Sequence, residues 1–242
     1  MINKNDLNIK IFADGASLDQ IKLLNELDYI SGFTTNPSLI RQAGIDDYEE
    51  FALSLLSIVK DKSVSFEVFA DDIDNMRKQA LKIASWGKNV AVKIPITNTQ
   101  QETTTDLIVE LANNNVMCNV TAIFKTEQIE TILEKINIDA PIIYSIFAGR
   151  IADTGLNPEI IIKNAVSMID SFKKAEILWA SSRELYNIVQ AINCNCQIIT
   201  VGHDLLNKID LFGKDLDIFS LETVKMFYSD AASSNFKINT EK

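Results

Sequence analysis

The sequence predicts an α/β protein of the (β/α)₈ TIM-barrel class, on three observations. Short strand-like runs alternate with longer segments of helical periodicity along the whole chain. Eight strand candidates can be counted, and no linker rich in Gly, Ser or Pro interrupts them. The 242 residues, 47% of them apolar, suffice for one large core. An open, doubly wound sheet stays an alternative, although the chain lacks the G-x-G-x-x-G loop that binds dinucleotides in such sheets.

Each predicted strand is a short apolar run bounded by turn residues or by the start of a helix. In chain order these runs are Asn8 to Asp14, Gly32 to Asn36, Ser63 to Phe69, Asn89 to Ile96, Val116 to Phe124, Pro141 to Phe147, Ala175 to Ser181 and Gln197 to Val201.

Amphipathic helices are predicted between the strands. Ser17 to Gln20 resembles a capping box, and Asn157-Pro158 places proline at a first helical position. Further helices are predicted at about Asp46 to Lys60, Asp71 to Ser85, Gln100 to Asn113, Thr126 to Ile136, Arg183 to Ile192 and Asp204 to Ile209. A last helix, about Asp217 to Ser233, is expected to pack on the barrel or on a neighbouring subunit. We predict one domain, 1–242, with 210–242 as a C-terminal helical extension.

Composition restricts the classes of function. Acidic residues outnumber basic ones, 33 to 23, and a net charge of −10 would repel a nucleic-acid backbone. No apolar run approaches the roughly 18 residues needed to cross a bilayer, and no signal peptide is recognisable. Cys118, Cys194 and Cys196 lack the spacing of a zinc site or a disulfide framework. We expect a cytoplasmic protein with reduced thiols packed as small apolar groups, no metal, and no nucleic-acid or membrane partner.

Polar residues interrupt or end the predicted strands. In a (β/α)₈ barrel alternate side chains point inward, and the carboxyl ends of the strands form the active-site face. Any one of these residues is more simply a strand cap or a satisfied core hydrogen bond, but their joint occurrence favours a site. The residues concerned are Asp14, Thr34, Asn36, Glu67, Asn119, Thr121 and Ser145, with Phe147 on the face of Ser145.

Lys93 lies in the middle of the apolar run Asn89 to Ile96. Desolvation favours a neutral amine, which can attack a carbonyl and form a Schiff base. Taken alone, this lysine could equally reach solvent from a strand end or close an internal ion pair. With its polar neighbours it predicts chemistry on a ketone, in which Asp14 or Glu67 moves protons and the amides and hydroxyls orient sugar hydroxyl groups.

Arg150 and Arg183 directly follow the sixth and seventh predicted strands. A guanidinium group binds phosphate oxygens in a bidentate fork, and a nearby helix start adds backbone donors. For either arginine alone, an ordinary surface salt bridge explains its presence equally well.

Six motifs follow one another in register: Phe12-Ala13-Asp14, Gly32 to Leu39, Val92-Lys93-Ile94-Pro95, Asn119-Val120-Thr121, Ser145 to Arg150, and Ala180 to Arg183. Together they resemble the transaldolase family, in the branch of short chains that also contains the fructose-6-phosphate aldolases. The resemblance runs from about Ile9 to Ile209.

This resemblance implies a class I transfer of a dihydroxyacetone unit from a ketose phosphate, fructose 6-phosphate or sedoheptulose 7-phosphate, to an aldose phosphate. No cofactor or metal is implied. Lys93 would attack the ketose carbonyl, Asp14 would move protons at the sugar hydroxyls, and Glu67 with Thr121 would hold a water near the imine. The implied substrate-binding residues are Thr34, Asn36, Asn119, Ser145 and Phe147 for the sugar, and Arg150, Ser181 and Arg183 for the phosphate.

Two positions favour transfer over simple aldol cleavage. In the aldolases of this family the position of Phe147 resembles a tyrosine and that of Glu67 a glutamine. A tyrosine hydroxyl would supply a proton donor that Phe147 lacks. Reversible cleavage of the fructose-6-phosphate aldolase type stays the nearest alternative, and a non-catalytic sugar-phosphate-binding barrel a more distant one.

Ser182 and the segment Val201 to Asp204 depart from the family pattern and leave the acceptor sugar open. His203 could contact substrate, or serve a loop or helix start, and Gly202 could admit a ligand or form a simple turn. A homo-oligomer is expected.

Overall fold

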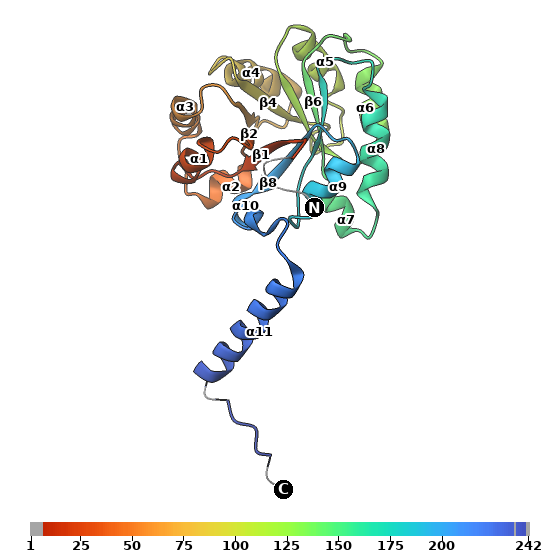
Figure 1. Cartoon of the computed structure of the whole chain (residues 1–242). Helices are drawn as coiled ribbons and strands as arrows, with labels where there is room; N and C mark the ends of the chain where they lie inside the picture. Colours follow the sequence, from red (N-terminus) through yellow and green to blue (C-terminus); the bar gives the residue numbers. More distant parts are fainter. Residues whose placement is uncertain (1–6, 235, 241–242) are drawn as a thin grey trace.

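Eight parallel strands form a closed barrel in the order in which they follow one another along the chain, as the computed structural model shows (Figure 1). The structure describes residues 7–234 and 236–240; the remaining residues of the predicted domain 1–242 lie outside it. The predicted (β/α)₈ class is therefore confirmed. The strands are β1 (Lys10–Asp14), β2 (Ile30–Thr34), β3 (Ser63–Glu67), β4 (Val90–Pro95), β5 (Cys118–Ile123), β6 (Ile142–Ile146), β7 (Ala175–Trp179) and β8 (Ile198–Gly202).

All helices but the last surround the barrel (Figure 1). The prediction for Pro158 is confirmed; of the capping box only the Ser17 half is present, because the Gln20 side chain contacts His203. The Ser17 side chain accepts a hydrogen bond from Gln20 N, and Asn157 caps the helix that Pro158 begins. The predicted helices are α1 (Leu18–Asn25), α3 (Tyr48–Ile58), α4 (Ile73–Ala84), α5 (Thr105–Asn113), α6 (Glu127–Leu133), α8 (Pro158–Met168), α9 (Asn187–Asn193), α10 (His203–Leu206), which the 3₁₀ turn Ile209–Leu211 follows, and α11 (Leu216–Ser233).

Two predicted helix starts were wrong. Helix α5 begins at Thr105 rather than Gln100, because Asn98 Oδ1 accepts hydrogen bonds from the amides of Gln100 and Glu102 and holds them in a loop. Helix α9 begins at Asn187 rather than Arg183, because Asn187 Oδ1 accepts from the amides of residues 183 and 184. In both places a local side-chain acceptor competes with the helical bond.

Two short helices were not predicted, α2 (Pro37–Gln42) and α7 (Ala148–Asp153). Helix α2 had a recognisable start, since Asn36 caps it by accepting from Leu39 N and Pro37 occupies its first position. Both helices follow strands directly and so lie at the carboxyl end of the barrel, where they contribute to the site.

The interior of the barrel is closed by an apolar cluster of Phe12, Ile143, Leu178, Ala180 and Ile198. Gly32 makes room for Phe12, because a Cβ at this glycine would lie 2.7 Å from the phenylalanine ring. The inward side chains therefore form a packed floor rather than a pore.

Helix α11 extends away from the barrel, and none of its residues is buried (Figure 1). The alternative that this helix packs on the barrel was therefore wrong; packing on a neighbouring subunit stays a prediction. No helix among the described residues combines the length and apolarity of a bilayer span. The three cysteines are buried with free thiols, as expected.

Candidate active site

A cavity of about 480 Å³ lies at the carboxyl end of the barrel. Its volume is in the usual range for a small-molecule site. Every predicted site residue except Arg183 lines it, namely Asp14, Thr34, Asn36, Glu67, Lys93, Asn119, Thr121, Ser145, Phe147, Arg150 and Ser181.

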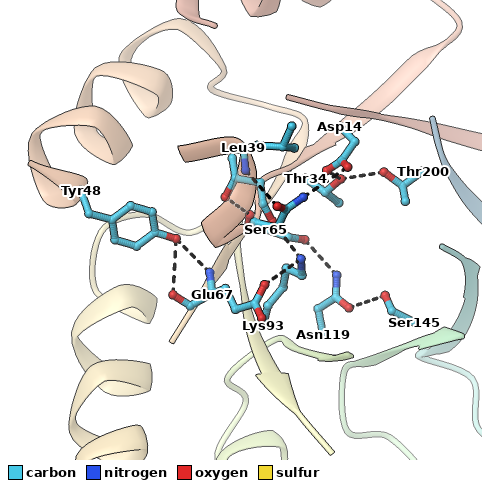
Figure 2. Close-up of polar contacts among 12 residues, drawn as sticks. Asp14, Thr34, Leu39, Tyr48, Ser65, Glu67, Lys93, Asn119, Ser145 and Thr200 are labelled. Atoms are coloured by element: carbon cyan, nitrogen blue, oxygen red, sulfur yellow. Dashed lines mark hydrogen bonds and ion pairs between the residues drawn. The ribbon is translucent and has the colours of Figure 1, made fainter. Parts of the chain in front are cut away.

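Strand register aligns the central residues of the cavity. Lys93 on β4 is paired in register with Glu67 on β3 and with Asn119 on β5. Residues in register on neighbouring strands project to the same side of a sheet. The amine, the carboxylate and the amide therefore lie side by side on the inner wall (Figure 2).

Lys93 is only 7% exposed, and two oxygens contact its Nζ. Glu67 Oε2 lies 3.0 Å away, and the backbone carbonyl of Thr35 accepts a hydrogen bond at 2.8 Å (Figure 2). The internal ion pair that the sequence left open is therefore present. It is compatible with nucleophilic chemistry, because a proton passed from Lys93 to Glu67 would leave a neutral amine beside the cavity.

Asp14, at the end of β1, provides a second carboxyl group. Its oxygens accept hydrogen bonds from Thr34 Oγ1 at 2.7 Å and from Asn36 Nδ2 at 3.4 Å. Burial raises the pKa of Asp14 above its ordinary value, and the charge of Lys93 and the Thr34 hydrogen bond only partly oppose this. A carboxyl group that retains a proton more readily than usual suits general acid–base work.

Asn119 is fixed by two side chains. Its Nδ2 donates to Ser65 Oγ at 3.1 Å, and its Oδ1 accepts from Ser145 Oγ at 2.6 Å (Figure 2). Beyond it, the β5–β6 pairing is irregular between Val120 and Ile123, and Ala122 has a φ of 59°. This irregularity lets the neighbouring residues Thr121 and Ala122 both line the cavity.

Of the two predicted phosphate-binding arginines, only one lines the cavity. Arg150 lines the cavity, with its guanidinium carbon 5.2 Å from the centroid of the Phe147 ring. Arg183 does not line it; its Nε donates to Asp153 Oδ1 at 3.3 Å, and its Nη2 pairs with the other carboxylate oxygen. The structure thus brings Arg150 into the site and places Arg183 in a salt bridge outside it.

Gly149 permits this arrangement around Arg150. A Cβ at Gly149 would lie 1.6 Å from the backbone oxygen of Ser181, so α7 can approach the end of β7 only because this residue is glycine. Ser181 itself adopts a φ of 63°.

Several lining residues were missed. Thr200 shares the inward parity of the predicted residues and could have been found by it; its Oγ1 lies 2.6 Å from Thr34 Oγ1. Ser65 has the same parity, but it contacts Asn119 and does not itself line the cavity. Ser38 and Gln42 line the cavity from the unpredicted helix α2. The Thr35 contact had no sequence signal, because a backbone carbonyl makes it.

The two segments that depart from the family pattern do not line the cavity. Ser182 donates to Thr200 O at 2.8 Å. The His203 ring packs on Gly15, and its Nδ1 contacts the Gln20 side chain. Burial lowers the pKa of His203, against the charges of Asp14 and Asp204. Within the described part of the chain no three His, Cys, Asp or Glu residues are grouped as metal ligands would be; that the reaction needs no metal stays a prediction.

The chain is similar in sequence to a known protein family and to several curated proteins. The family model "Transaldolase/Fructose-6-phosphate aldolase" matches residues 11–242. The chain is 35% identical over 223 residues to "Probable transaldolase 2" of Listeria monocytogenes, covering 88% of this chain and 98% of that protein. It is 33% identical over 199 residues to "Probable transaldolase" of Dehalococcoides mccartyi, covering 82% and 88%.

Among solved structures, the chain resembles the KGPDC of Streptococcus mutans, with a TM-score of 0.51, 10% identity, and 81% and 88% of the two chains covered. It also resembles a native KDPGal structure, with a TM-score of 0.54, 12% identity, and 83% and 84% covered. At these identities the likeness extends to the fold alone.

Proposed function

Because the chain belongs to the transaldolase/fructose-6-phosphate aldolase family, we propose that it transfers a dihydroxyacetone unit between sugar phosphates through a Schiff base on Lys93. The observation that carries the proposal is the position of the Lys93 amine, nearly buried at the cavity wall between a carboxylate and an amide. A non-catalytic sugar-phosphate-binding barrel would not account for a nearly buried amine between these two groups.

In the proposed reaction, Lys93 Nζ adds to the ketose carbonyl, and water leaves as the imine forms. Removal of a proton from the C4 hydroxyl then breaks the bond between the third and fourth carbons. An aldose phosphate leaves, and the enamine that stays on Lys93 adds to the second aldehyde, whose oxygen takes up a proton. Water then hydrolyses the new imine, which releases the product ketose phosphate and restores the Lys93 amine. Asp14 serves as the proton acceptor and donor at the sugar hydroxyls, which its raised pKa supports. Glu67 and Thr121 hold the water at the imine.

In this proposal the polar side chains that line the cavity orient the substrate. Asn36, Asn119 and Ser145 bind the dihydroxyacetone portion, with Thr34 holding Asp14 in place. The hydrogen-bonded row from Ser65 to Ser145 supports this role, since it fixes the Asn119 amide before substrate arrives. Arg150, Ser181 and Arg183 bind the phosphate.

Demand for an acceptor distinguishes transfer from simple cleavage. With fructose 6-phosphate alone we expect negligible release of glyceraldehyde 3-phosphate, and with erythrose 4-phosphate added we expect continuous release. Transfer is favoured by Phe147, which offers no hydroxyl to protonate the enamine. Borohydride added to enzyme and fructose 6-phosphate should leave an adduct on Lys93, found by peptide mass analysis. Release at the same rate without acceptor would favour the aldolase alternative; bound substrate with no adduct would falsify the Schiff base.

Phosphate binding by Arg183 requires this side chain to leave Asp153, so two variants should act in opposite directions. Arg183→Ala should raise KM for fructose 6-phosphate by roughly 10-fold or more with a smaller change in kcat, because a charge-assisted hydrogen bond to substrate is lost. Asp153→Asn should lower KM, because the guanidinium is released. Steady-state kinetics with both variants tests this. An unchanged KM in both would assign Arg183 to a surface salt bridge only.

A homo-oligomer is part of the proposal. Helix α11 exposes large apolar side chains, among them Leu221, Val224 and Phe227, each more than half exposed. Such a surface is unusual for a monomer, and sedimentation analysis would reveal a monomer if the proposal is wrong. The cytoplasmic location stays a prediction.

A further inference from the structure

The pairing between β2 and β3 opens beside the catalytic lysine. Thr35 N still donates to Ser65 O, at 3.2 Å. In a regular parallel ladder the next bond would run from the amide of Glu67 to the carbonyl of Thr35. Here the Thr35 carbonyl accepts from Lys93 Nζ at 2.8 Å, and the Glu67 amide donates to the hydroxyl of Tyr48 at 2.9 Å (Figure 2). Two backbone groups that would bind one another each have a different partner.

Tyr48 reaches this opening from outside the barrel, as the first residue of α3. Its ring packs on Phe69, with the centroids 4.5 Å apart, and meets Phe66 and Trp86 edge to face. The hydroxyl also donates to the Glu67 carbonyl, at 3.4 Å. It therefore contacts both backbone groups of the residue whose carboxylate pairs with Lys93.

The ionisation state of Tyr48 suits a structural donor and acceptor. Burial raises its pKa to about 12, although hydrogen bonds with the Glu67 backbone and the Thr35 side chain oppose the shift. The hydroxyl thus keeps its proton near neutral pH, and it can accept from one backbone group while donating to another.

We propose that Tyr48 is a positioning residue for the reaction: its hydroxyl fills the gap in the β2–β3 ladder and so keeps the Thr35 carbonyl and the Glu67 carboxylate against Lys93. The inference rests on the proposed function, in which Lys93 is the nucleophile. Without the hydroxyl, the Glu67 amide loses the acceptor that it has in this structure, and the acceptor that a regular parallel ladder would offer it is the Thr35 carbonyl. Closure of that bond withdraws one oxygen from Lys93 and turns the Glu67 backbone that carries the other.

Tyr48→Phe tests the inference, and Tyr144→Phe is its matched control. Tyr144 on β6 is fully buried, and its hydroxyl has no hydrogen-bond partner in the described part of the chain. The measured quantity is the single-turnover rate constant for formation of the Lys93 adduct with fructose 6-phosphate, trapped by borohydride. This rate constant does not depend on the fraction of the enzyme that is folded. We expect Tyr48→Phe to lower this rate roughly 10- to 100-fold, with KM changed by less than about threefold, because the reacting groups are displaced rather than removed. Tyr144→Phe should leave both unchanged.

Each outcome decides the matter. A wild-type rate in Tyr48→Phe, with or without lower resistance to urea, overturns the positioning role and leaves the Schiff base intact. No adduct in the wild-type enzyme overturns the proposed function, and the inference with it. If Tyr48→Phe does not fold, p-aminophenylalanine at position 48 supplies a group that donates and accepts; its rate should stay within about threefold of wild type, and a larger loss would contradict the role assigned to the hydroxyl.

Discussion

Lys93→Ala should lower kcat for transfer by roughly four orders of magnitude or more and should abolish the borohydride adduct, because no other group at the cavity wall replaces the covalent nucleophile. The fold should persist. Removing the ammonium group leaves Glu67 without its ion-pair partner, which costs up to about 3 kcal/mol for a carboxylate that keeps some contact with solvent. Circular dichroism and urea unfolding, measured beside the kinetics, separate the two effects. In the double variant Lys93→Ala/Glu67→Gln, stability should recover while activity does not.

Lys62→Ala is the control for loss of a partly buried lysine. Lys62 Nζ donates to the carbonyls of Asn25 and Leu27, and burial lowers its pKa. It precedes β3, at the end of the barrel opposite the cavity, so its removal should lower stability and leave the adduct and kcat intact. An adduct formed by Lys93→Ala as readily as by wild type would assign the chemistry to another residue.

Asp14→Asn should lower kcat by about 10² to 10⁴, the usual contribution of a general acid–base group. The same substitution should stabilise the fold at neutral pH. Because burial raises the pKa of Asp14 in the folded state, ionisation of this carboxyl is less favourable there than in the unfolded chain. Asparagine carries no charge, and its Oδ1 can still accept from Thr34.

The size of this stability difference should change with pH. Below the unfolded value of about 3.9, Asp14 is protonated in both states and the difference between variant and wild type is smallest. As pH rises above that value, Asp14 ionises first in the unfolded chain, so the wild-type protein loses stability. The difference in unfolding free energy between the variant and wild type therefore grows. It stops growing once pH passes the folded-state pKa of Asp14. Urea unfolding of both proteins between about pH 4 and 8 measures it. A difference that is constant across this range would contradict the raised pKa.

Much of the site could be predicted because strand parity is a local property. Lys93, Glu67, Asn119 and Ser145 were recognised as polar residues in apolar runs, and all of them line one cavity. Ser65 and Thr200 obey the same rule and were simply not selected. Helices α2 and α7 were missed because each is only six residues long, too short for a hydrophobic period to be read.

Contacts between distant segments could not be predicted in this way. Arg183 comes shortly after β7 in sequence, yet it pairs with Asp153 because α7 packs close enough at Gly149 to bring the two together. The hydroxyl of Tyr48 and the carbonyl of Thr35 depend on where β2 leaves the sheet. Neither a tyrosine hydroxyl on a helix outside the barrel nor a backbone carbonyl gives a recognisable pattern in the sequence.

The sequence by itself determined the class of fold, the family motifs and the set of polar side chains that face inward, because alternation along a strand fixes the side to which each residue points. Only the tertiary structure decided that Lys93 stands in register between Glu67 and Asn119 and binds the carbonyl of Thr35. The register of parallel strands, and the point at which a ladder opens, follow from the packing of the whole barrel, in which each strand is positioned by both of its neighbours.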